Sequence, residues 1–281
     1  MESLIIAGCL VACALALSVA GCEAAGVRDA LPPMPKGQMW ELVWHDEFDG
    51  HKLDETKWGA PEHKTRDAWW TRKAVVLDGK GHLAIRIFKE ADRYYDGGVL
   101  TQGKFEHTFG YYVARIRLHR QQGHWCAFWL WNMRHQEDGS FGPDSNEADI
   151  MERFWPAADG RIGHALHWRR GGGEFNKTGY TSRVPGVGEG WHTFAVLWLP
   201  GEYVFYVDGK ETWRTREGLC QNPMYILLTD EMLFQQGDGD IRKASLPDEF
   251  LVDYVRVYDL VDAKTGQPAM KPTEPPPSDS R

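Results

Sequence analysis

The segment Tyr203–Trp213 reads YVFYVDGKETW, and its chemistry alone predicts a β-hairpin. Two runs rich in β-branched and aromatic residues flank Asp208 and Gly209, a dipeptide that favours the positive φ angles of a tight turn. Similar short runs recur on both sides of this segment, divided by Gly, Asp and Pro, and no 12-residue window keeps the period of an amphipathic helix. About a dozen strands in one domain indicate a two-sheet sandwich or a barrel.

The composition narrows the class of protein. The chain of 281 residues is 42% hydrophobic and 26% charged, which is typical of a globular protein rather than a disordered or fibrous one. Its net charge of −8 supplies no basic excess for phosphate contacts, so we expect no nucleic-acid partner. The 13 Trp residues are unusual, and exposed indoles would suggest ligand stacking.

The beginning of the chain resembles an export signal. Residues 4–21 are apolar and uncharged, and they end in Val19-Ala20-Gly21-Cys22, which resembles the lipobox of bacterial lipoproteins. We therefore expect residues 1–21 to be a signal peptide and Cys22 to be lipidated, which would anchor an exported protein in the cell envelope. A plainly cleaved signal, giving a periplasmic or secreted protein, and a retained N-terminal anchor are the alternatives.

The rest of the chain divides into three parts. Residues 22–38 are predicted to be a tether, residues 39–262 one folded domain, and the Pro- and Ser-rich residues 263–281 a disordered tail. The folded part contains Cys126 and Cys220, which form either one disulfide or two separate buried thiols. We expect the protein to be a monomer.

One predicted strand is apolar on both faces. In Trp125–Trp131, the residues Cys126, Phe128 and Leu130 share one face, whereas Trp125, Trp129 and Trp131 share the other. A sheet in a sandwich packs only one face on the core. The three Trp residues therefore either meet another layer or line an open groove, where indole rings could stack on sugars.

Three acids follow in the segment Asn146–Phe154, which reads NEADIMERF. In a regular strand, Glu147 and Asp149 would face one way and Glu152 the other, among apolar neighbours, where a lone carboxylate is costly. A β-bulge at Ile150-Met151 would instead place all three acids on one face.

Three acids on one face repel one another, so the arrangement indicates a function. Glycoside hydrolysis fits, because retaining enzymes use two carboxyl groups about 5–5.5 Å apart, one as nucleophile and one as acid/base. A divalent-metal site and a solvated acidic edge are the alternatives.

The same segment, Glu147-x-Asp149-x-x-Glu152, resembles the E-x-D-x-x-E signature of glycoside hydrolase family 16. Five further segments resemble family motifs in the right order: Trp44–Gly50, Gly110–Leu118, Gly123–Leu130, Trp191–Gly209 and Val252–Tyr258. Val113 and Cys126 replace the usual Glu and Pro of two motifs, and Leu227–Glu231 lacks the L-N-x-A-V-G-G stretch of many β-1,3-glucanases of the family. The last departure weakens the assignment to laminarinases in particular.

The resemblance implies a concanavalin A-like β-jelly-roll sandwich with a concave sugar-binding cleft. It implies retaining endo-hydrolysis of a β-linked polysaccharide, either a β-glucan such as laminarin or mixed-linkage glucan, or a marine galactan. By position, Glu147 is the nucleophile, Glu152 the acid/base and Asp149 the assisting acid. A transglycosylase with the same site, a non-catalytic glycan-binding lipoprotein and an envelope scaffold are the competing functions.

The resemblance also suggests residues around the acids. Trp125, Trp129 and Trp131 are expected to bind sugar, together with His167 and Glu231. No cofactor is required, although family members often carry a structural calcium, and the side chains suggested to bind it are Glu47 and Asp253. Arginines could bind sulfate esters of a galactan, and those considered are Arg66, Arg72, Arg169 and Arg170.

Overall fold

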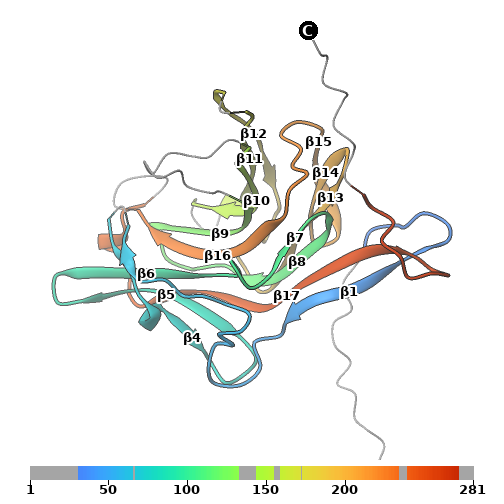
Figure 1. The fold of residues 1–281 in the computed structure, drawn as a ribbon. Helices are drawn as coiled ribbons and strands as arrows, with labels where there is room; N and C mark the ends of the chain where they lie inside the picture. Colours follow the sequence, from blue (N-terminus) through green and yellow to red (C-terminus); the bar gives the residue numbers. More distant parts are fainter. Residues whose placement is uncertain are drawn as a thin grey trace, which may run out of the picture.

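The computed structural model describes residues 31–65, 67–132, 144–154, 159–171, 173–233 and 239–271. These residues form strands and short 3₁₀ turns, arranged as two curved β-sheets that pack face to face (Figure 1). The expected all-β sandwich is confirmed. Within these ranges, no helix has the length and hydrophobicity needed to cross a bilayer. The predicted signal peptide and Cys22 lie outside the described residues.

The first sheet contains β1 (Gln38–Asp46), β4 (Val75–Leu77), β5 (Leu83–Glu90), β8 (Gly110–Arg117), β13 (His192–Leu199), β14 (Glu202–Val207), β15 (Lys210–Thr215) and β17 (Asp248–Asp262). The long strand β17 joins its two halves, because it pairs with β1 and β5 along one edge and with β8 along the other. From β8 the sheet continues through β13 and β14 to β15.

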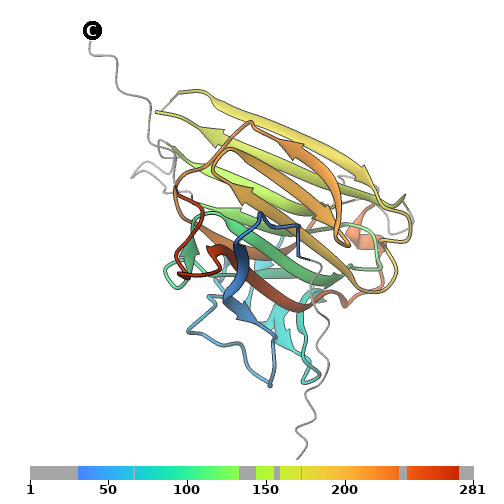
Figure 2. The same cartoon turned by 90° about the vertical axis from the view of Figure 1, so that its right-hand side faces the viewer.

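The second sheet contains β6 (Arg93–Leu100), β7 (Glu106–His107), β9 (His124–Trp131), β10 (Asn146–Arg153), β11 (Arg161–Arg169), β12 (Phe175–Arg183) and β16 (Met224–Met232). Its order runs from β6 and β7 through β16, β9, β10 and β11 to β12. The short strands β2 (His63–Lys64) and β3 (Trp69–Trp70) extend it beside β6. The sheet curls, so that β12 stands up from the plane of β9 and β16 (Figures 1 and 2).

The main core lies between the sheets, and β9 shows how the sequence builds it. Its inward side chains, Cys126, Phe128 and Leu130, are completely buried. The indoles on its other face are only partly buried. The Trp-rich face of this strand therefore lines an open surface rather than a third layer.

The hairpin predicted from Asp208 and Gly209 is present. β14 and β15 pair up to Val207 and Lys210, and the two residues between them have φ angles of 50° and 70°, as predicted. Residues 263–271, which the sequence placed in a disordered tail, instead fold back on the domain, where Ala269 N donates a hydrogen bond of 2.8 Å to Leu260 O. Cys126 and Cys220 are separate buried thiols, so they form no disulfide.

Candidate active site

Strand β10 is irregular at its middle. Asp149 pairs with Trp129 of β9, but the next pair joins Met151 to Phe128, so Ile150 is an extra residue on the β10 side. The pairing with β11 shifts over the same residues. This is a β-bulge at the place that the sequence predicted.

The bulge decides where the three acids point. Ile150 and Met151 are both completely buried in the core, although they are consecutive in the strand. Glu147 and Glu152 are partly exposed, and Asp149 lies between them at 5% exposure. All three carboxyl groups therefore face the outer surface of the second sheet.

The acids open into one pocket on that surface. Its lining combines residues of three neighbouring strands: Trp125, Ala127 and Trp129 of β9, Glu147, Asp149 and Glu152 of β10, and Thr229 and Glu231 of β16. The structure thus brings together most of the predicted site residues. His167 and Trp131 adjoin this group rather than lining the pocket itself.

The indoles make specific polar contacts beside the acids. Trp125 Nε1 donates a hydrogen bond of 2.9 Å to Glu152 Oε1, which fixes the orientation of that carboxyl group. Trp129 Nε1 donates to Thr229 Oγ1 at 3.2 Å. Trp131 lies against Trp129 with a ring distance of 5.2 Å and is the residue of β9 that pairs with Glu147, so the aromatic surface follows the row of acids along β9.

Asp149 is the most strongly perturbed acid of the site. Burial, reinforced by the nearby charge of Glu152, raises its pKa well above the usual value. His167 Nε2 lies 3.5 Å from Asp149 Oδ2 and 3.8 Å from Glu147 Oε1. These three side chains offer ligand atoms close enough for a metal ion, but a carboxyl group that keeps its proton is better suited to donating a hydrogen bond to a neighbouring carboxylate.

The raised pKa of Asp149 gives a prediction for stability. Because the folded protein holds a proton that the unfolded chain releases above about pH 4, the stability of the wild type should fall as the pH rises from there toward the folded pKa. Asp149→Asn removes this loss, so its Tm should exceed that of the wild type at pH 7, by about 2–4 °C for each kcal/mol gained. Thermal unfolding at pH 4 and pH 7 checks this, and an equal difference at both pH values would contradict it.

His164 of β11 holds the bulge from behind, and the sequence analysis did not identify it. Its Nδ1 donates a hydrogen bond of 2.8 Å to the carbonyl oxygen of Ile150, and its Nε2 lies 3.2 Å from Ser182 Oγ and 3.1 Å from Thr212 Oγ1. Burial lowers the pKa of His164 to about 4, so the ring is neutral at neutral pH. The ring therefore satisfies the carbonyl that the bulge removes from the regular ladder.

This contact predicts that His164 acts on catalysis through the bulge. His164→Phe keeps an aromatic ring but leaves the Ile150 carbonyl without its partner, at a cost of about 1–3 kcal/mol. We expect kcat to fall about 10- to 100-fold, because small displacements of catalytic groups are expensive, with little change in KM. His164→Asn, whose amide can donate at a similar position, should recover most of the rate. Equal kcat values for the Phe variant and the wild type would contradict this role.

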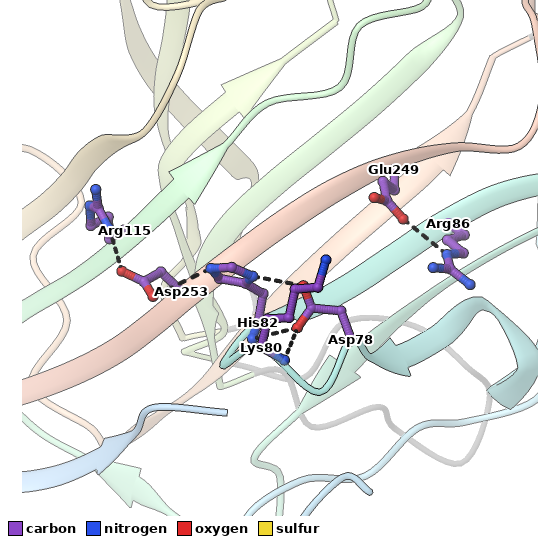
Figure 3. A network of polar contacts seen from close by, with 7 residues as sticks. All are labelled: Asp78, Lys80, His82, Arg86, Arg115, Glu249 and Asp253. Atoms are coloured by element: carbon purple, nitrogen blue, oxygen red, sulfur yellow. Dashed lines mark hydrogen bonds and ion pairs between the residues drawn. The ribbon is translucent and has the colours of Figure 1, made fainter. Parts of the chain in front are cut away.

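The side chains suggested for calcium are paired with arginines. Glu47 receives hydrogen bonds from Arg256 Nε at 2.9 Å and Nη2 at 2.7 Å. Asp253 accepts one of 2.5 Å from Arg115 Nη1 and lies 3.9 Å from His82 Nε2 (Figure 3). A calcium ion at either carboxylate would compete with a guanidinium group, and its binding there stays a prediction.

The sequence matches a known family over the part of the chain that contains the three acids. The profile described as glycosyl hydrolases family 16 matches residues 62–229, which include the acids and both flanking strands. A β-glucanase of Rhodothermus marinus is 28% identical over 81% of this chain and 88% of its own length. A keratan-sulfate endo-1,4-β-galactosidase of Sphingobacterium multivorum is 27% identical over 79% of this chain, which spans 56% of that relative.

A solved structure shows the same architecture. The endo-β-1,3-glucanase of Pyrococcus furiosus aligns with a TM-score of 0.68 at 26% identity, covering 81% of this chain and 97% of its own. The matching profile covers more than half of the sequence and contains the acid-bearing strand. The chain therefore belongs to glycosyl hydrolase family 16, and the protein is a glycoside hydrolase.

Proposed function

We propose that the protein hydrolyses internal bonds of a β-linked polysaccharide with retention of configuration. Glu147 is the proposed nucleophile, Glu152 the acid/base and Asp149 the assisting acid. The observation that carries the proposal is the β-bulge of β10, which places three carboxyl groups in one open pocket beside Trp125 and Trp129. A merely acidic surface would not require a buried histidine to hold such a bulge.

Each step has a group in position. Glu147 attacks the anomeric carbon as the glycosidic bond breaks, and Glu152 gives its proton to the leaving oxygen. Glu152 then takes a proton from the water that cleaves the glycosyl-enzyme, and Glu147 leaves as a carboxylate. Asp149, kept protonated by burial, can donate a hydrogen bond to Glu147 and so hold the nucleophile in place.

The substrate is proposed to be a neutral β-glucan in the first place. The Rhodothermus marinus and Pyrococcus furiosus relatives are a β-glucanase and an endo-β-1,3-glucanase, which supports this choice. Two arginines considered for sulfate binding are already engaged: Arg72 Nη1 binds Glu55 Oε1 at 2.7 Å, and Arg170 contacts Asn146 and the carbonyl oxygen of Leu219. Arg66 lies outside the described residues.

A panel of polysaccharides tests the proposal. We expect reducing ends to appear with laminarin or mixed-linkage glucan, faster than with xyloglucan, agarose, carrageenan or keratan sulfate. Early products should be oligosaccharides rather than single sugars, and NMR of the fresh products should show the β-anomer. Inverted products would contradict the mechanism, and activity on a galactan alone would replace the substrate while leaving the mechanism intact.

The cellular setting stays a prediction from sequence. The apolar segment that ends in Cys22 supports export and a lipid anchor in the cell envelope. Such an anchor would keep the enzyme at the membrane while the pocket faces soluble polysaccharide. The monomeric state is likewise an expectation.

A further inference from the structure

Two histidines and an aspartate that the proposed reaction does not use lie together inside the sandwich. His119 follows β8, His124 begins β9, and Asp230 lies on β16. The side chains of His124 and Asp230 are completely buried, and His119 is 1% exposed. Each residue offers one ligand atom, and these atoms lie within 4.8 Å of one another.

The contacts within the cluster resemble those of a metal site. His124 Nδ1 lies 2.9 Å from Asp230 Oδ2 and 3.1 Å from Oδ1. Ligand atoms around a tetrahedral zinc ion, with bonds of about 2.0–2.1 Å, are separated by about 3.3 Å, so this spacing fits two ligands of one ion. The rings of His119 and His124 are nearly parallel, with centroids 4.4 Å apart, so both can present a nitrogen on the same side.

A second carboxylate lies near His124 on the side away from Asp230. Its Nε2 lies 3.4 Å from Asp248 Oδ2 at the start of β17, within ion-pair distance but without the geometry of a hydrogen bond. Asp248 Oδ2 is itself fixed by backbone N–H groups of Arg120 and Gln121, at 2.9 and 2.7 Å. Metal-bound histidines usually direct their second nitrogen to such a carboxylate, which orients the ring.

Without a metal, the cluster is hard to explain. A charged His124 between two aspartates would account for Asp230 and Asp248, but not for His119. The Nδ1 atom of His119 is buried and has no hydrogen-bond partner among the described residues. An unsatisfied ring nitrogen stacked on a charged ring costs free energy, whereas a shared metal ion would use it.

We propose that His119, His124 and Asp230 bind a zinc ion that clamps β9 to β16 beneath the active site. Two imidazoles and one carboxylate favour zinc over calcium or magnesium, which prefer oxygen ligands. The three ligands are buried and none of them lines the pocket of the acids, so we assign the ion a structural rather than a catalytic role. On the outer face of the same two strands, Trp125 pairs with Glu231, and both line the pocket.

Metal analysis of tag-free protein tests this proposal. We expect about one zinc ion per chain after dialysis, as for a structural site, and a Tm that falls when a strong chelator is present. His119→Phe should lose the zinc, whereas His192→Phe, which alters a histidine paired with Asp208 elsewhere, should keep it. Wild-type protein without bound zinc, grown with zinc in the medium, would overturn the site.

The stability of His119→Phe distinguishes a zinc site from a cluster that binds no metal. If no metal binds, His119→Phe replaces a ring whose buried Nδ1 has no hydrogen-bond partner by an apolar one and should be neutral or stabilising. If zinc binds, the variant should be less stable than the wild type. Should it fail to fold, refolding the wild type with Co²⁺ decides, because three such ligands and one further donor, such as a water molecule, predict the strong visible absorption of a four-coordinate ion. Weak absorption typical of hydrated Co²⁺ would contradict the proposal.

Discussion

Glu147→Gln is expected to abolish hydrolysis of the polysaccharide, with kcat reduced by about 10⁴-fold or more. The amide keeps the size of the side chain but is a far weaker nucleophile than a carboxylate, so the glycosyl-enzyme cannot form. Glu147 is partly exposed, and its neighbour Asp149 already keeps a proton, so the folded state should change little. Steady-state kinetics together with thermal unfolding measure both effects.

Two comparisons make this result specific. Glu249→Gln alters a carboxylate on the first sheet that is paired with Arg86 at 3.0 Å, and it should retain wild-type kcat (Figure 3). Glu147→Ala should regain turnover of an activated aryl glycoside when azide is added, because azide can attack from the vacated side and leave an α-glycosyl azide. Full activity of Glu147→Gln would show that another group is the nucleophile.

The sequence was sufficient to predict the bulge because two local rules conflict there. Strict alternation would bury Glu152 beside Ile150, which is costly, and one extra residue removes the conflict. The hairpin at Asp208 and Gly209 was predictable for a similar reason, since the turn chemistry is contained in neighbouring residues. Both features depend on residues that are close in the chain.

The groups that support the site could not be predicted in this way. His164 reaches the Ile150 carbonyl from the neighbouring strand, and its partner Thr212 lies 48 residues further along the chain. The histidines of the proposed zinc site are separated from Asp230 by more than a hundred residues. Four residues lie between His119 and His124, a spacing known from zinc sites, but no Cys-x-x-Cys pair accompanies it in this sequence, so the spacing alone did not indicate a metal. The register of β9 against β16 brings His124 and Asp230 together, and the segment that joins β8 to β9 adds His119.

For the described residues that follow β17, the prediction of disorder was wrong. Residues 264–271 are the first part of the Pro- and Ser-rich stretch 263–281, for which composition predicted disorder. The structure returns this segment to β17, where Ala269 bonds to Leu260 and Met270 packs against the core. One partly buried side chain and a few backbone hydrogen bonds order these residues, although their average composition suggests disorder.

Glu152→Gln should show a loss of activity that depends on the leaving group. For a polysaccharide, loss of the general acid is expected to lower kcat by about 10²–10⁴-fold. For a dinitrophenyl glycoside the leaving group needs no proton, so formation of the glycosyl-enzyme should be nearly as fast as in the wild type. The second step still lacks its base, so the intermediate should accumulate and be visible by mass spectrometry of the intact protein.

This dependence distinguishes an acid/base from a nucleophile or a structural carboxylate. Glu147→Gln should be inactive on both substrates, since its defect precedes any role of the leaving group. Trp125→Phe removes the indole N–H that binds Glu152 Oε1 but leaves the carboxyl group, so it should lower kcat less than Glu152→Gln does. An equal loss for Glu152→Gln on both substrates would exclude proton donation, and the carboxyl group bound by Trp125 would then serve only to shape the pocket.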